Sequence, residues 1–150
     1  MDNAQVNVVP VTCRLSDLAV STTESDKSTT AAILKADDPF VLHVLIEFQG
    51  MGAIALLSLA PTIRATFAAK PFGPGTEVIL GQTVIDTNPE QFAYPMHLRV
   101  ESPQSLGLTF GTVYRVSTLL CIGAPNSPAL INGFIQGLAM EIYPSPTSSD

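Results

Sequence analysis

Two histidines are the side chains of this sequence best suited to metal binding or acid–base chemistry. His43 and His97 each lie in a segment with apolar residues at every second position, Phe40–Phe48 and Phe92–Val100. A period of two is typical of a half-buried strand. Both histidines fall on the side opposite to the apolar residues of their own segment, so we expect both to face away from the core.

The two histidines can meet only if their strands are neighbours in one sheet. An antiparallel register that pairs Phe40 with Val100 sets His43 directly opposite His97. Opposed side chains have Cβ atoms about 4.5–5.5 Å apart, and two imidazoles at that spacing can share a divalent metal. Zinc sites take three or four protein ligands, of which the sequence names only these two. A metal-dependent ligand binder or enzyme that uses His43 and His97 is therefore one hypothesis, and two separate solvent-facing histidines are the alternative.

Motifs for other catalytic chemistry do not occur in the sequence. It contains no Gly-x-Ser-x-Gly elbow and no His-Glu-x-x-His pair, the motifs that position a nucleophilic serine or a catalytic zinc. The glycines of Gly73–Gly75 lack the Lys-Ser/Thr that follows in a phosphate-binding loop. Hydrolysis by two carboxylates that the fold brings together stays open. We expect a protein that is not an enzyme and holds no cofactor.

Two smaller groups of residues have alternative interpretations. Asp37 and Asp38 precede a strand, where they are either calcium ligands or a turn signal that opens the strand. Cys13 and Cys121 lie in apolar, strand-like segments. We expect them to stay free thiols in a reducing compartment, and a disulfide between them is the alternative.

Composition limits the classes of partner. Charged residues make up 13% of the 150-residue chain, and a formal net charge of −6 leaves no basic stripe for nucleic acid. The first residues lack the pattern of a secretory signal, and the uncharged apolar run Ala53–Pro61 is far shorter than the ~18 residues of a membrane span. We therefore expect a cytoplasmic protein that binds neither nucleic acid nor membrane. The absence of tryptophan argues against a sugar-binding platform.

The alternation around the histidines also predicts the fold class. Strand-like segments are separated by turns that use many of the 12 prolines and 10 glycines. We expect one all-β domain over residues 1–150, a two-sheet antiparallel β-sandwich of seven or eight strands. Residues 21–30 are expected to form a mobile loop, 144–150 a flexible tail, and Ala53–Ala60 a short helix rather than a buried strand. The other expected strands are Val6–Val20, Thr62–Ala69, Glu77–Asp86, Val113–Ile122 and Phe134–Tyr143.

The segment Leu108–Val116 resembles the start of the sixth strand of immunoglobulin-like and fibronectin-like sandwiches. In that family a turn glycine, here Gly111, precedes a tyrosine, here Tyr114, whose hydroxyl bonds back to the preceding loop. The resemblance implies an immunoglobulin-like outline, in which the strands of His43 and His97 are sheet neighbours. The core tryptophan of antibody domains is missing. Because such folds host many unrelated functions, the resemblance implies no activity.

The last two expected strands carry more apolar side chains than one core can take. Each has apolar residues on both faces, whereas a two-layer sandwich covers only one face of each sheet. An exposed apolar face is typical of contacts between proteins. We expect a non-catalytic binding or structural module that forms a homo-oligomer through this face. Covering of the face by Ala53–Ala60 or by the long loop is the alternative. The expected interface residues are Val113, Leu119, Ile135 and Tyr143.

Overall fold

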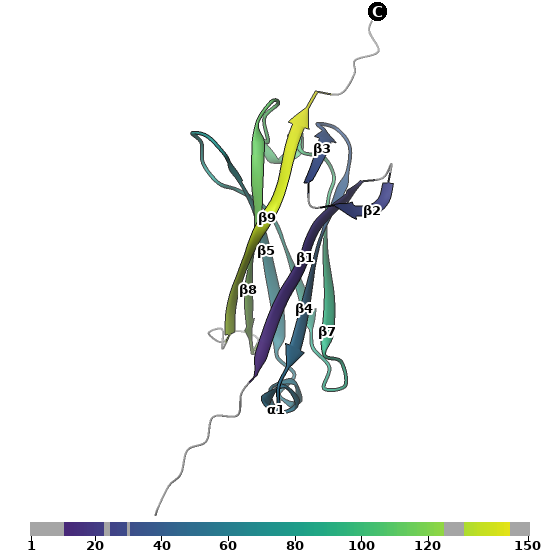
Figure 1. The fold of residues 1–150 in the computed structure, drawn as a ribbon, viewed down its shortest axis with the longest axis vertical. Coiled ribbons are helices and arrows are strands. Elements are labelled where there is room, and N and C mark those ends of the chain that lie inside the picture. Colours follow the sequence, from purple (N-terminus) through teal and green to yellow (C-terminus); the bar gives the residue numbers. More distant parts are fainter. Residues whose placement is uncertain (1–10, 23–24, 30, 125–130, 145–150) are drawn as a thin grey trace, which may run out of the picture.

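The computed structural model of the chain describes residues 11–22, 25–29, 31–124 and 131–144. Within these residues the chain forms nine strands, one short α-helix and one turn of 3-10 helix (Figure 1). The first elements are β1 (Thr12–Thr22), β2 (Ser25–Thr29), β3 (Ala31–Lys35), β4 (Phe40–Gln49), α1 (Gly52–Ser58) and β5 (Thr62–Pro71). They are followed by β6 (Val78–Asp86), β7 (Ala93–Val100), η1 (Gln104–Leu106), β8 (Val113–Gly123) and β9 (Ile131–Tyr143).

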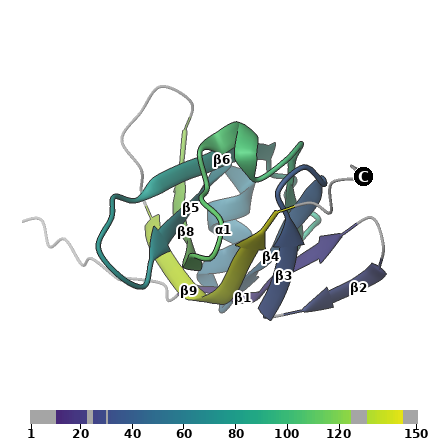
Figure 2. The ribbon, with the colours of Figure 1, turned by 90° about the horizontal axis from the view of Figure 1, so that it is seen from above.

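The strands form two sheets that pack face to face. One sheet has the strand order β2-β1-β4-β7 and the other the order β3-β9-β8-β5-β6. Figure 1 and Figure 2 show the two layers, and in Figure 1 α1 lies at the end of the sandwich opposite to the end of β9. Neighbouring strands are antiparallel except for β3, which runs parallel to β9. The prediction of an all-β, two-sheet sandwich with one short helix is confirmed, and the parallel β3–β9 pair is an addition to it.

The core lies between the sheets and uses the alternating residues of their strands. In β4, every second side chain from Phe40 to Phe48 is at most 3% exposed. Fully buried side chains of the other sheet, among them Phe67 and Met140, belong to the same apolar cluster. Burying a large apolar side chain contributes about 1.5–3 kcal/mol, so the pattern fixes which face of β4 points inward. His43 is therefore directed to the other face.

The segment between β4 and β5 is helical, as expected. In α1 the Ser58 hydroxyl donates a hydrogen bond to the carbonyl oxygen of Ile54 at 2.7 Å. The helix buries Ala53 and Leu57 against one end of the core, and it ends before Pro61. No helix in the described ranges has the length and apolar character needed to cross a membrane. Because α1 closes an end of the sandwich, it leaves the outward sides of both sheets uncovered (Figure 1).

One segment expected to be a loop contains a strand. Within residues 21–30, β2 pairs with β1 through Val20 opposite Thr29 and Thr22 opposite Ser25, which corrects the prediction there. The physical reason is that backbone hydrogen bonds to β1 can hold a polar segment as an edge strand, and that Thr22 and Thr29, which stand in this ladder, are β-branched and favour extended backbone. Residues 6–10 of the first expected strand and residues 145–150 of the expected tail lie outside the described residues.

Two tyrosines fasten loops to the ends of strands. The hydroxyl of Tyr114 accepts a hydrogen bond from the backbone N–H of Thr109 at 3.0 Å, which is the backward contact that the sequence predicted. The hydroxyl of Tyr94 accepts from the backbone N–H of Asn88 at 2.8 Å and donates to its carbonyl oxygen at 2.9 Å. These bonds fix the loops before β8 and β7.

Candidate interaction surface

The side of the five-stranded sheet that faces away from the core, here called the outer face, carries exposed apolar side chains on several strands. Phe134 of β9 pairs with Leu119 of β8 in the sheet register, and these side chains are 60% and 48% exposed. Ile79 and Val84, on the edge strand β6, are 57% and 49% exposed, and Val113 of β8 is exposed as well. These side chains make up an apolar surface that the chain itself does not bury.

A β-bulge decides which side chains of β9 reach the outer face. The register between β8 and β9 shifts between Val116 and Ser117, which leaves Gly137 of β9 as an extra residue. Gly137 has φ of 144°, a backbone conformation that glycine adopts at little cost. The extra residue reverses the alternation along β9. Phe134 therefore points outward on one side of the bulge, while Leu138 on the other side points into the core.

The bulge corrects one of the four expected interface residues. Ile135 is half-buried and packs against the core instead of lying on the outer face. Its neighbour Phe134 occupies the outward position that the unbroken alternation assigned to Ile135. The available signal was Gly137, since a glycine inside a strand pattern often marks a bulge.

The other three expected interface residues lie where the sequence placed them. Val113 and Leu119 are exposed on the outer face. Tyr143 is half-buried at the end of β9, on the side opposite to the buried Ile142. Leu119 thus lies beside Phe134 of the neighbouring strand, whereas Val113 lies six residues away along β8, opposite Glu141.

The outward side of the four-stranded sheet has a different character. It carries His43 and His97 on adjacent strands. Arg99 and Glu101 form an exposed ion pair, with 3.4 Å between Nε of Arg99 and Oε1 of Glu101. Polar and charged groups of this kind are what an outward sheet face in water normally shows.

The outer face of the five-stranded sheet carries cations too, among them Arg64 and Arg115. The difference between the sheets is that, within the described residues, the exposed large apolar side chains that lie on strands all belong to the five-stranded sheet. Its outer face is therefore the candidate interaction surface.

The two histidines come together in the antiparallel register that the metal hypothesis requires. Phe40 pairs with Val100 and His43 with His97, and the imidazole centroids lie 4.7 Å apart with their planes at 83°. On the other side of His43, the Ser21 hydroxyl lies 2.7 Å from its Nε2 atom. Burial and the neighbouring charge of His97 lower the pKa of His43 from its ordinary value of 6.5. His43 is therefore neutral at neutral pH.

The histidine pair offers two metal ligands. In the described part of the chain, no group of three or more His, Cys, Asp or Glu side chains is close enough to hold one ion. The bond between Ser21 and Nε2 of His43 also directs that nitrogen toward β1, whereas His97 lies on the opposite side in β7. A metal shared by the pair would need His43 to turn and further ligands from water or from another molecule.

The remaining candidates lie apart from one another. Cys13 packs against the core, where burial raises the pKa of its thiol to about 11. Cys121 is half-buried on β8, and both cysteines are free thiols. Asp37 and Asp38 belong to the turn between β3 and β4, in which the backbone N–H of Asp38 donates to the carbonyl oxygen of Lys35. This geometry agrees with the turn interpretation of the two aspartates.

Comparison with known proteins gives no family. No protein-family model matches the chain, and no curated protein matches its sequence. Among solved structures, the chain is similar to AggA of Escherichia coli, the major subunit of aggregative adherence fimbriae type I. The TM-score is 0.41 with 6% identity over 96% of this chain and 100% of that one.

Two enzymes also contain a region of similar shape. A putative β-galactosidase of Bacteroides fragilis gives a TM-score of 0.38 with 13% identity over 79% of this chain. A β-glucosidase of Kluyveromyces marxianus gives 0.33 with 9% identity over 89% of this chain. The chain spans 15% of the length of each enzyme. Scores this low carry no inference about function.

Proposed function

We propose that the chain is a non-catalytic interaction module that self-associates through the outer face of its five-stranded sheet. The exposed pair of Leu119 and Phe134 carries this proposal, because the two side chains are direct neighbours on adjoining strands. Large apolar side chains that are exposed together, rather than scattered singly, are typical of surfaces that bind protein.

The row of residues that contains this pair is free of charge. Across four strands, Phe134 pairs with Leu119, Leu119 with Thr66, and Thr66 with Gln82. Charged groups resist burial because they must lose their hydration, and the cores of interfaces are depleted in them. A second copy can therefore cover this row without burying a charge of the row itself, and Arg64, two residues from Thr66 on the same face of β5, would lie at its edge.

A second copy of the chain is the occupant that we propose for the outer face. In a two-fold dimer both partners use the same patch, so every side chain in the patch is buried twice, once in each partner. Burying a half-exposed apolar side chain contributes about 1 kcal/mol, roughly half of the value for full burial. Association costs at least ~4 kcal/mol in lost freedom of motion. The five exposed apolar side chains of the outer face, counted in both partners, contribute about 10 kcal/mol and leave about 6 kcal/mol after this cost. That corresponds to a dissociation constant of tens of micromolar at best, so we expect a weak dimer rather than an obligate one.

Size measurement on a matched pair of variants tests the proposal. Leu119→Glu places a charge in the uncharged row and should shift the protein to single chains in gel filtration with light scattering. Ile54→Glu is the control, because Ile54 is 64% exposed on α1 and lies away from the outer face. Equal behaviour of Leu119→Glu and Ile54→Glu would remove the outer face as the interface.

We also propose that the sandwich is immunoglobulin-like. The neighbours β4 and β7 correspond to the second and fifth strands of that topology, and the order β9-β8-β5-β6 corresponds to its G-F-C-C′ sheet. The bond between Tyr114 and Thr109 at the start of β8 supports the same assignment. A crystal structure in which β4 and β7 are not adjacent would contradict it.

Metal-dependent binding at His43 and His97 is the second candidate function, supported by the 4.7 Å between the ring centroids. Equilibrium dialysis against Zn²⁺ followed by elemental analysis tests it. If the histidine pair binds metal, the native protein should hold about one Zn²⁺ ion per chain or per dimer. The double variant His43→Gln, His97→Gln should lose that ion. Equal metal content in both proteins would exclude the histidine pair as the site.

A further inference from the structure

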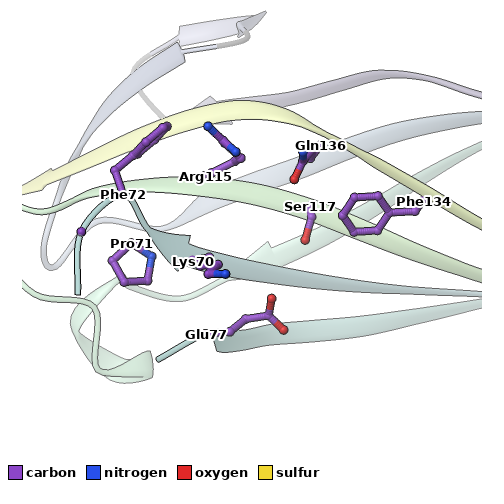
Figure 3. A pocket seen from close by; sticks show the side chains of 9 residues that line it. Lys70, Pro71, Phe72, Glu77, Arg115, Ser117, Phe134 and Gln136 are labelled. Carbon is purple, nitrogen blue, oxygen red and sulfur yellow. The ribbon is translucent and has the colours of Figure 1, made fainter. Parts of the chain in front are cut away.

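A hollow of about 450 Å³ opens on the outer face between β9, β8, β5 and the loop after β5. Figure 3 shows Phe72 and Arg115 on one side of the small side chain of Ser117 and Phe134 on the other. Ser117 pairs with Ala68 of β5 in the sheet register. Two small side chains between larger ones explain why the sheet surface is recessed at this point.

The lining of the hollow is cationic although the chain as a whole is acidic. Lys70 and Arg115 both line it, and Glu77 is the one carboxylate among the lining residues. Neither cation forms an ion pair within the described residues. The chain has only seven basic residues and a net charge of −6. Two cations against the one carboxylate of Glu77 leave this recess with a net positive charge, which marks a local preference for an anion.

The side chain of Arg115 is positioned by a neighbouring ring so that it can bind such an anion. Its guanidinium carbon lies 4.7 Å from the centroid of the Phe72 ring, a stacked arrangement that leaves the N–H groups at the guanidinium edge free. A stacked guanidinium loses less freedom when it binds a carboxylate than a mobile one does. The ring of Phe134 and the amide of Gln136 lie across the hollow (Figure 3). They supply an apolar wall and a hydrogen-bonding group.

We infer that this hollow binds a small organic anion with a flat apolar body, the class of aromatic carboxylates. The carboxylate would lie between Lys70 and Arg115, and the ring would lie against Phe134. The volume of the hollow falls within the range of about 300–1,000 Å³ that is usual for small-molecule sites. For a ligand of this size in an open hollow, a dissociation constant on the order of 0.1–1 mM is expected.

Titration with a charged and a neutral ligand of the same shape tests the inference. The probes are 1-naphthoate and 1-naphthalenemethanol, followed by amide chemical shifts in NMR at fixed salt. Naphthoate should bind at least fivefold more tightly than the alcohol and should move the amide signals of Lys70, Ser117 and Gln136. Equal affinities, or shifts confined to other parts of the chain, would overturn the inference.

Single-charge variants locate the anion. Arg115→Gln and Lys70→Gln should each weaken naphthoate binding at least fivefold and leave the binding of the alcohol within twofold. Arg64→Gln is the matched control, because Arg64 is an exposed cation of β5 that does not line the hollow. Equal weakening by Arg64→Gln would show a general charge effect and would overturn the assignment of the site.

The test separates this inference from self-association, although both use Phe134. Leu119 does not line the hollow, so Leu119→Ser gives a chain with a weakened interface and an intact hollow. Naphthoate should bind to this variant as tightly as to the native chain, or more tightly where a second copy competes. If the native chain stays monomeric but binds naphthoate, only the proposed self-association is refuted. If Leu119→Ser no longer binds naphthoate, the hollow is refuted as a site that is independent of the interface.

Discussion

Leu119 of β8 lies directly opposite Phe134 of β9, and both side chains point away from the core into solvent. A two-layer sandwich already fills its interior with the other faces of these strands. The pair therefore lies outside the core of the single chain, and about half of its surface stays exposed. Its exposure is explained if a second copy covers it, and the following experiments examine the features on which that explanation rests.

The bulge at Gly137 should be required for the stability of the last strand. Gly137→Val places a β-branched side chain at φ of 144°, where the expected cost is about 1–3 kcal/mol of folding free energy. Ala139→Val on the same strand is the control, since Ala139 stands in the regular ladder. Urea unfolding measures both variants. A Gly137→Val protein as stable as Ala139→Val would mean that the bulge is absent or easily rearranged.

Thr118 offers a stabilising substitution in the core. Its side chain is fully buried, and its hydroxyl has no hydrogen-bond partner among the described residues. Thr118→Val keeps the shape and removes the unpaired hydroxyl, so the free energy of unfolding should rise by about 1 kcal/mol. Thr83→Val should lower it by a similar amount, because the Thr83 hydroxyl donates to the carbonyl oxygen of His97 at 2.8 Å. A loss of stability in Thr118→Val would reveal a partner for that hydroxyl.

The histidine pair should make stability depend on pH. Burial and His97 lower the pKa of folded His43 below 6.5, so the unfolded chain takes up this proton first as the pH falls. The stability from His43 is therefore complete above pH 6.5 and is lost as the pH falls toward the folded pKa. Unfolding in urea at a series of pH values measures the slope. His97→Gln should raise the pKa of His43 in an NMR titration, and a native pKa at or above 6.5 would contradict the account.

The alternation of apolar residues was enough to predict the strands and the two sheets. The pairing of the histidines also required their strands to be neighbours, which only the immunoglobulin-like resemblance implied. In β4 and β7 the pattern is unbroken, so it shows which side chains face outward. The observed register, Phe40 with Val100 and His43 with His97, is one of several that the pattern allows.

The alternation of apolar residues was not enough in β9. There the extra residue at Gly137 places Phe134 on the outer face and turns Ile135 toward the core. An alternating pattern does not show where a β-bulge shifts the alternation by one residue.

The hollow beside Phe134 could not be predicted from the sequence for a different reason. Its cations come from β5 and β8, its glutamine and one phenylalanine from β9, and the other phenylalanine from a loop. These residues are far apart in the chain, and none of them belongs to a motif of fixed spacing. Only the sheet register, which sets Ser117 between larger neighbours, brings them around one recess.

Sedimentation equilibrium of the native chain from one to one hundred micromolar tests the central claim most directly. The account predicts a weight-average mass that rises with concentration above the 15.9 kDa of a single chain, and that returns to this value in Leu119→Glu. A native mass that stays at the single-chain value over the whole range would contradict self-association through the outer face.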